Sequence, residues 1–131
     1  MPRSPNPKPR PKIPHTFVVE ALESLRPEVR RMFSGFALYV GNRMHMMLRD
    51  NPKFPEDNGI WLVLSEVIDP ADPALRRELP SLRPIQTIGG KVGHWLLIPS
   101  DQSNFETEAL HVCDLILRQD PRLGRIPQSR R

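Results

Sequence analysis

The segment from Arg30 to Leu48, RRMFSGFALYVGNRMHMML, contains two apolar runs joined by Gly41-Asn42. A glycine at the first central position of a two-residue loop supplies a positive φ without a steric penalty, which is typical of a type II′ turn. The spacing therefore predicts a β-hairpin with strands at Phe36–Val40 and Arg43–Leu48. This hairpin constrains the fold more than any other segment of the chain.

Both faces of this predicted hairpin are apolar. With a two-residue loop, Leu38 opposes His45 and Phe36 opposes Met47. Alternation then gives one face Phe36, Leu38, Val40 and Met47 beside Arg43 and His45, and the other face Ala37, Tyr39, Met44, Met46 and Leu48. A sheet with helices on one side is expected to be polar on the other. The second face is therefore expected to be covered by a further helix, by a second copy of the chain, or by a small hydrophobic ligand.

Large exposed apolar surfaces usually mark interfaces, and methionine adapts well to irregular partners. If a second copy of the chain covers the second face of the hairpin, the two copies form a homodimer through that face. The candidate interface residues are Tyr39, Met44, Met46, Leu48 and Trp61.

Helical periodicity predicts a helix over residues 17–25, with Thr16 as its N-cap. Pro27 either kinks this helix or opens a second one over residues 27–33. Asp72 and Pro73 fit the N-cap and first position of a short helix that ends at Leu79.

The last helix is predicted to begin with a capping box formed by Ser103 and Glu106. Its apolar face contains Phe105, Ala109, Val112, Cys113 and Ile116, widened by Leu110 and Leu117.

Three more strands are predicted at Ile60–Ser65, Arg83–Ile88 and His94–Ile98, with residues 89–93 as a hairpin turn between the last two. Antiparallel strands between terminal helices predict a two-layer α+β fold with about five mainly antiparallel strands. We expect one domain over residues 16–120, a Pro-rich basic tail at 1–15 and a basic tail at 121–131.

The segment around the hairpin resembles the N-terminal domain of the TfoX/Sxy family, the bacterial competence regulators. Arg31, Met32, Phe33 and Gly35 match the family pattern, Leu38 and Tyr39 follow on the first strand, and Ser34 replaces the usual first glycine. The resemblance covers residues 16–118 in outline, and residues 30–48 are motif-like. It implies a fold like that of secretion chaperones, with helices against an antiparallel sheet, and it implies no enzymatic activity.

The basic charge of the chain lies at its two ends. All fifteen acidic residues lie between Glu20 and Asp120, against eleven Lys or Arg in that range. The tails either aid solubility or contact phosphates through salt-sensitive, sequence-independent attraction. The candidate phosphate contacts are Arg3, Lys8, Arg10, Lys12, Arg122, Arg125, Arg130 and Arg131.

No motif for catalysis stands out. The four histidines lack metal-ligand spacing, the single Cys113 cannot form an internal disulfide, and no nucleophile motif is recognisable. We therefore expect no catalytic residue, cofactor or metal, and a cytoplasmic protein without a membrane span.

The sequence thus predicts an interaction or regulatory domain that binds a second copy of itself or another protein. Weak nucleic-acid contact through the tails, or small-molecule binding beside the hairpin, are the alternatives.

Overall fold

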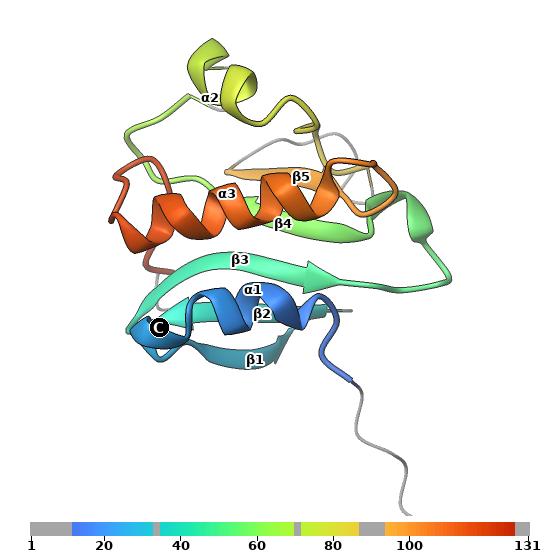
Figure 1. The fold of residues 1–131 in the computed structure, drawn as a ribbon, viewed down its shortest axis with the longest axis horizontal. Coiled ribbons are helices and arrows are strands. Elements are labelled where there is room, and N and C mark those ends of the chain that lie inside the picture. Colours follow the sequence, from blue (N-terminus) through green and yellow to red (C-terminus); the bar gives the residue numbers. More distant parts are fainter. Residues whose placement is uncertain (1–11, 33–34, 70–71, 87–93, 128–131) are drawn as a thin grey trace, which may run out of the picture.

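The computed structural model describes residues 12–32, 35–69, 72–86 and 94–127. Its centre is a five-stranded antiparallel sheet in which the strands lie side by side in chain order (Figure 1). The strands are β1 (Glu28–Met32), β2 (Gly35–Val40), β3 (Arg43–Arg49), β4 (Gly59–Val63) and β5 (Trp95–Pro99). The predicted α+β class and the predicted number of strands are confirmed.

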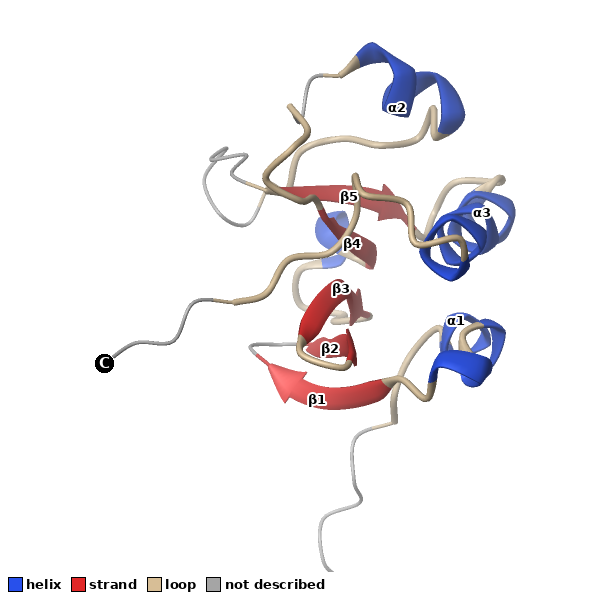
Figure 2. Cartoon of the chain, turned by 90° about the vertical axis from the view of Figure 1, so that its left-hand side faces the viewer, coloured by secondary structure: helices blue, strands red, loops and turns tan. Residues whose placement is uncertain are grey.

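Two helices cover one face of the sheet. Helix α1 (Thr16–Ala21) and helix α3 (Phe105–Leu117) lie on the same side of it, and the short helix α2 (Pro73–Glu78) lies beyond β5 (Figure 2). Two 3-10 turns complete the elements, η1 (Glu23–Leu25) after α1 and η2 (Pro55–Asp57) before β4. The main core lies between the two helices and the sheet.

One strand comes from a segment that we expected to be helical. Arg26 adopts a left-handed backbone conformation with φ 53°, which turns the chain after η1. Residues 28–32 then pair along their whole length with β2. The helix predicted over 27–33 is wrong for residues 28–32, because hydrogen bonding to a neighbouring strand overrides local preference.

The predicted strand Arg83–Ile88 is absent where it can be assessed. Arg83 forms an isolated bridge with Leu97, and residues 84–86 are irregular. Residues 87–93, which include the predicted turn at 89–93, lie outside the described residues. The strand count was therefore correct, although one of the five predicted strands was not.

The helix starts were predicted with mixed success. Asp72 caps α2 as predicted, since its Oδ1 accepts a hydrogen bond from the Ala74 N–H at 2.7 Å. His15, and not Thr16, occupies the N-cap position of α1. The predicted capping box of α3 is wrong, because Asn104 is the N-cap residue and the Ser103 hydroxyl donates to Asn104 Oδ1.

The apolar face of α3 faces the core as predicted, but its edge differs. Leu110 and Leu117 are exposed, whereas Leu115 and Glu108 are buried. The Glu108 carboxylate accepts hydrogen bonds from the Ser81 backbone N–H at 3.2 Å and from the Ser81 hydroxyl at 2.7 Å. Glu108 therefore fastens the segment after α2 to α3.

Substituting Glu108 tests this attachment. We expect Glu108→Ala to lower the free energy of unfolding by about 1–3 kcal/mol, since it leaves the Ser81 donors without their acceptor. Glu106→Ala, an exposed position on the same helix, is the control and is expected to cost less than about 1 kcal/mol. Urea denaturation of both variants measures the difference, and equal losses would contradict this role of Glu108.

Candidate functional site

A β-bulge in the β2–β3 hairpin shapes the candidate site. Gly41 has φ 62°, as the predicted turn requires, and Val40 pairs with Arg43 as expected. Tyr39 pairs with Met44, but Leu38 then pairs with Met46, so that His45 is an extra residue on β3. The predicted pairs Leu38–His45 and Phe36–Met47 are therefore wrong. A bulge redirects side chains on its strand, and here it changes which methionines face the helices.

The bulge moves two predicted interface residues into the main core. Met46 and Leu48 are fully buried with Leu38 in the cluster under the helices. The other face has its own buried clusters, in which Met47 packs with Trp61 and Ile85. A sheet strand with one extra residue exchanges its two faces beyond that residue, which explains the misassignment.

The second face of the hairpin is not an exposed apolar patch. Met44 and Trp61 are 5% and 6% exposed, and Tyr39, half-buried, has the Arg30 guanidinium 4.4 Å above its ring centre. The indole N–H of Trp61 donates to the Asp57 carbonyl at 2.9 Å. Four of the five predicted interface residues, Met44, Met46, Leu48 and Trp61, are thus buried within the chain itself, and Tyr39 alone is partly exposed. Dimerisation of the chain stays a prediction.

The residues that follow α3 also belong to the fold. The C-terminal strap, residues 121–127, enters the sheet where β3 and β4 separate. Arg125 exchanges two backbone hydrogen bonds with Met44, at 2.9 and 3.0 Å, and the Gly124 N–H donates to the Val63 carbonyl at 2.9 Å. The predicted tail at 121–131 is therefore wrong for residues 121–127.

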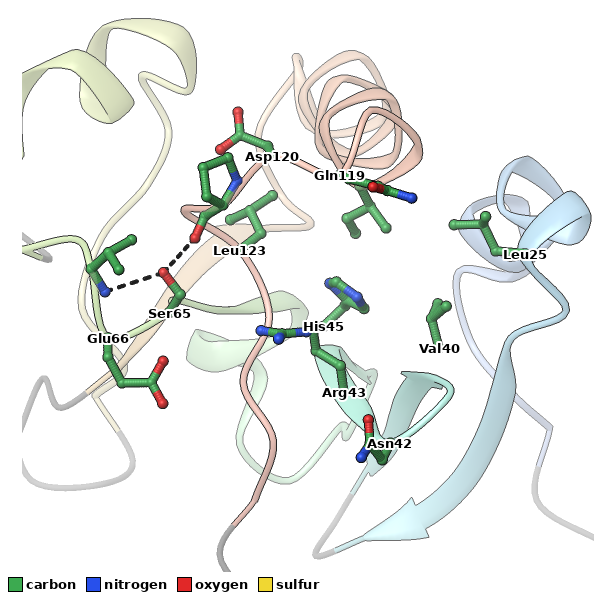
Figure 3. Close-up of a pocket in the computed structure, with 13 residues that line it drawn as sticks. Leu25, Val40, Asn42, Arg43, His45, Ser65, Glu66, Gln119, Asp120 and Leu123 are labelled. Atoms are coloured by element: carbon green, nitrogen blue, oxygen red, sulfur yellow. Dashed lines mark hydrogen bonds between the residues drawn. The ribbon is translucent and has the colours of Figure 1, made fainter.

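A pocket of about 550 Å³ lies between the strap and the hairpin (Figure 3). Val40, Arg43 and the bulge residue His45 come from β2 and β3, and Leu25 comes from η1. The remaining lining residues come from the loop at the turn, the segment after β4, the end of α3 and the strap: Asn42, Ser65, Glu66, Val67, Ile116, Gln119, Asp120, Pro121 and Leu123. Segments far apart in the sequence thus build one cavity.

His45 is the distinctive polar group of this pocket. Its side chain is 8% exposed, and its Nδ1 is buried without a hydrogen-bond partner. Burial, and secondly the positive charge of Arg43, lower the pKa of His45 to about 4, so the ring is neutral at pH 7. The strap packs tightly here, since a Cβ on Gly124 would lie 2.6 Å from His45 Cε1.

The charged side chains around the pocket have different partners. Arg43 Nη1 donates to the Gly124 carbonyl at 3.1 Å. Asp120 is bound by Arg122 through both carboxylate oxygens, at 3.0 and 2.9 Å, and the Arg122 hydrogen bond lowers the pKa of Asp120. Glu66 lies across the strap from His45 in Figure 3. Burial, and secondly the positive charge of Arg125, lower the pKa of His94, and the negative charge of Glu66 partly offsets this lowering.

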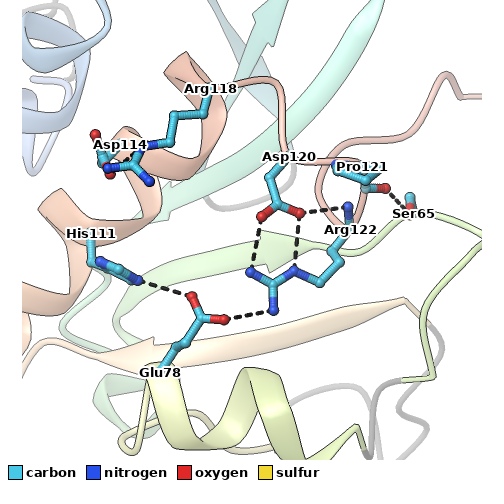
Figure 4. Close-up of polar contacts among 8 residues, drawn as sticks. All are labelled: Ser65, Glu78, His111, Asp114, Arg118, Asp120, Pro121 and Arg122. Atoms are coloured by element: carbon cyan, nitrogen blue, oxygen red, sulfur yellow. Dashed lines mark hydrogen bonds and ion pairs between the residues drawn. The ribbon is translucent and has the colours of Figure 1, made fainter.

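A polar network behind the pocket connects α2 to α3 and the strap (Figure 4). Glu78 accepts from Arg122 Nη1 at 2.8 Å and contacts His111 Nε2 at 3.1 Å. These hydrogen bonds, with Arg122 first and His111 second, lower the pKa of Glu78. The network fixes Arg122, and through it Asp120, at the edge of the pocket.

The predicted phosphate contacts divide into three groups. Arg122 is paired with Asp120 and Glu78, and Arg125 Nε donates to the Leu64 carbonyl at 3.2 Å, so both serve the fold. Lys12 is exposed. The others, Arg3, Lys8, Arg10, Arg130 and Arg131, lie outside the described residues. Arg122 and Arg125 therefore do not lie in a free tail, and the predicted phosphate contacts stay predictions.

The fold and the site define an α+β domain with one face of its sheet under two helices and a ligand-sized pocket at a bulged hairpin. Within the described ranges, no helix is long and apolar enough to cross a membrane, and no group of three or more His, Cys, Asp or Glu residues is placed to hold a metal ion. Comparisons with protein-family models, curated proteins and solved structures found no match.

The sequence did not reveal this pocket. His45 appeared to be an ordinary strand residue, and Leu25, Ile116 and Leu123 lie in segments that no local pattern connects. Gly124 carried the clearest signal, because a glycine within a basic segment permits close approach of two chain segments.

Proposed function

We propose that this chain is a non-enzymatic regulatory domain that binds a small molecule in the pocket between its strap and its hairpin. The pocket itself carries the proposal, because apolar side chains and the His45 ring line a space of about 550 Å³. His45 Nδ1 is covered by Gly124 of the strap, so a ligand would meet the rest of the imidazole ring. The pocket volume lies within the usual range for small-molecule sites.

Binding fits the side chains of the pocket better than catalysis does. A serine nucleophile needs a base that accepts its proton, but the Ser65 hydroxyl donates to the Pro121 carbonyl at 2.6 Å. A lowered pKa keeps His45 neutral, yet among the described residues no carboxylate orients its ring. The hydroxyl and the imidazole therefore do not form a catalytic pair.

The regulatory part of the proposal rests on the resemblance of residues 30–48 to the TfoX N-terminal domain. A regulatory domain passes ligand binding on to a partner, which we propose is a second copy or another protein. The outer edge of β1 suits such contact, since in the described part of the chain β1 pairs only with β2. Its exposed charges at Glu28, Arg30 and Arg31 favour a selective partner.

Filling the pocket tests the proposal. Val67 lines the pocket but is 75% exposed, so Val67→Trp places an indole at the entrance without disturbing the core. We expect phenylacetate, phenylacetamide or phenethylamine at millimolar concentration to shift the amide NMR signals of Val40, Arg43 and Leu123 in the unmodified protein. Val67→Trp is expected to weaken this binding at least about tenfold, the equivalent of about 1.4 kcal/mol.

Leu110→Trp is the matched control, because Leu110 is exposed on α3 outside the pocket. This variant is expected to bind as the unmodified protein does. No shift of pocket signals by any of the three compounds, or equal binding by the two tryptophan variants, would overturn the proposal.

A further inference from the structure

We infer that the pocket selects a small carboxylic acid, with its apolar body against Leu25, Val40 and Ile116 and its carboxylate beside Arg43. This inference rests on the proposed small-molecule site and adds the chemical class of the ligand. It follows from the separation of apolar and polar side chains in the pocket and from the way each charge is paired.

The apolar half of the pocket lies between α3, η1 and the sheet. Figure 3 places Leu25 and Val40 together on the side away from the strap. Ile116 and Leu123 are 3% and 2% exposed and extend this surface toward the strap. A compact hydrocarbon or aromatic group buries its surface here at about 25 cal/mol per Å² of apolar area.

The polar half favours a negative charge. Arg43 is the cation among the lining residues, it is exposed, and within the described part of the chain its guanidinium contacts the Gly124 carbonyl and no carboxylate. The carboxylates that line the pocket do not pair with it, since Asp120 is bound to Arg122 and Glu66 lies across the strap. A ligand carboxylate supplies the opposite charge, and charge-assisted hydrogen bonds to arginine are about twice as strong as neutral ones.

The chemistry of Arg43 distinguishes a carboxylate from other ligand groups. A carboxylate is purely an acceptor, and a guanidinium is purely a donor. His45 contributes ring surface to the pocket, since its Nδ1 is covered by Gly124. A primary ammonium group in the same place would meet the like charge of Arg43, and a neutral amide would lack the charge-assisted bond.

A matched series of ligands tests the inference on the full-length protein. Phenylacetate, phenylacetamide and phenethylamine share one carbon skeleton and differ in charge. We expect phenylacetate to bind at least about tenfold tighter than phenylacetamide by NMR titration, and phenethylamine to bind weakest. Arg43→Gln is expected to remove the preference for the acid while it retains binding of the amide, which shows that the pocket is intact.

Arg118→Gln is the matched control, since it removes one positive charge from an exposed site outside the pocket. It is expected to keep the preference for the acid. Equal affinity of acid and amide at the pocket, or a preference unchanged by Arg43→Gln, overturns the selection of acids and leaves the proposed pocket standing. Failure of all three compounds to bind overturns the proposed function as well.

Discussion

Replacing Gly59 with alanine is expected to destabilise the fold by at least about 3 kcal/mol, the largest effect that we predict for a single methyl group. Gly59 opens β4 and pairs with Arg49 on one side and with Pro99 on the other. Its φ of 138° is a backbone conformation that residues with a side chain rarely adopt. A Cβ added at this position would also collide with the Ile98 carbonyl oxygen. The backbone of β5 would have to move away from the sheet.

Gly41→Ala is the control for the backbone strain alone. Gly41 has φ 62°, but its Cβ would meet nothing within 4 Å. We expect this variant to lose about 1 kcal/mol, the cost of a left-handed conformation for alanine. Chemical denaturation followed by circular dichroism measures both variants. If Gly59→Ala loses no more unfolding free energy than Gly41→Ala, β4 and β5 do not approach each other at Gly59 as closely as described.

The second large effect is a loss of stability at mildly acidic pH caused by His45. The folded protein holds the pKa of His45 at about 4, whereas the unfolded chain takes up a proton near the ordinary value of 6.5. Because the unfolded state binds the proton first, stability falls as the pH drops from 6.5 toward 4. We expect the contribution of His45 to fall by about 2–3 kcal/mol between about pH 7.5 and about pH 4.5.

His45→Gln isolates this effect, because glutamine does not titrate. The difference in unfolding free energy between the two proteins is expected to shift in favour of the variant as the pH falls. The pocket presents Arg43 from β3, Glu66 from after β4 and Asp120 from after α3, and all three remain in the variant.

His94→Gln is the control, because burial also lowers the pKa of His94. This variant retains His45, so it is expected to keep the loss of stability that His45 causes as the pH falls. Urea denaturation at a series of pH values measures all three proteins. A difference between the unmodified protein and His45→Gln that does not change with pH would show that His45 is not buried as described.

Local signals in the sequence predicted the elements that depend on neighbours along the chain. Gly41-Asn42 fixed the tight turn of the hairpin, since a glycine at that position accepts a positive φ. Asp72-Pro73 marked the start of α2, and the helical period of residues 105–116 marked α3. Each of these features is specified within one or two turns of chain.

Predictions failed where a distant segment decides the outcome. Residues 28–32 form a strand because β2 offers them a partner. Of residues 83–86, which are the described part of the strand predicted at Arg83–Ile88, Arg83 alone forms a bridge, with Leu97. The bulge at His45 was hidden because both faces of the hairpin are apolar, so that no alternation of polar residues fixed the register.

The sequence by itself determined the class of the protein, an α+β domain with a five-stranded sheet, because hydrophobic periodicity and turn residues act locally. Tertiary structure alone decided the candidate site. The strap inserts between β3 and β4, the extra residue in β3 is His45, which lines the pocket, and Asp120 at the edge of the pocket pairs with Arg122. These contacts join residues up to 81 positions apart, as between Arg43 and Gly124, and no local pattern specifies them.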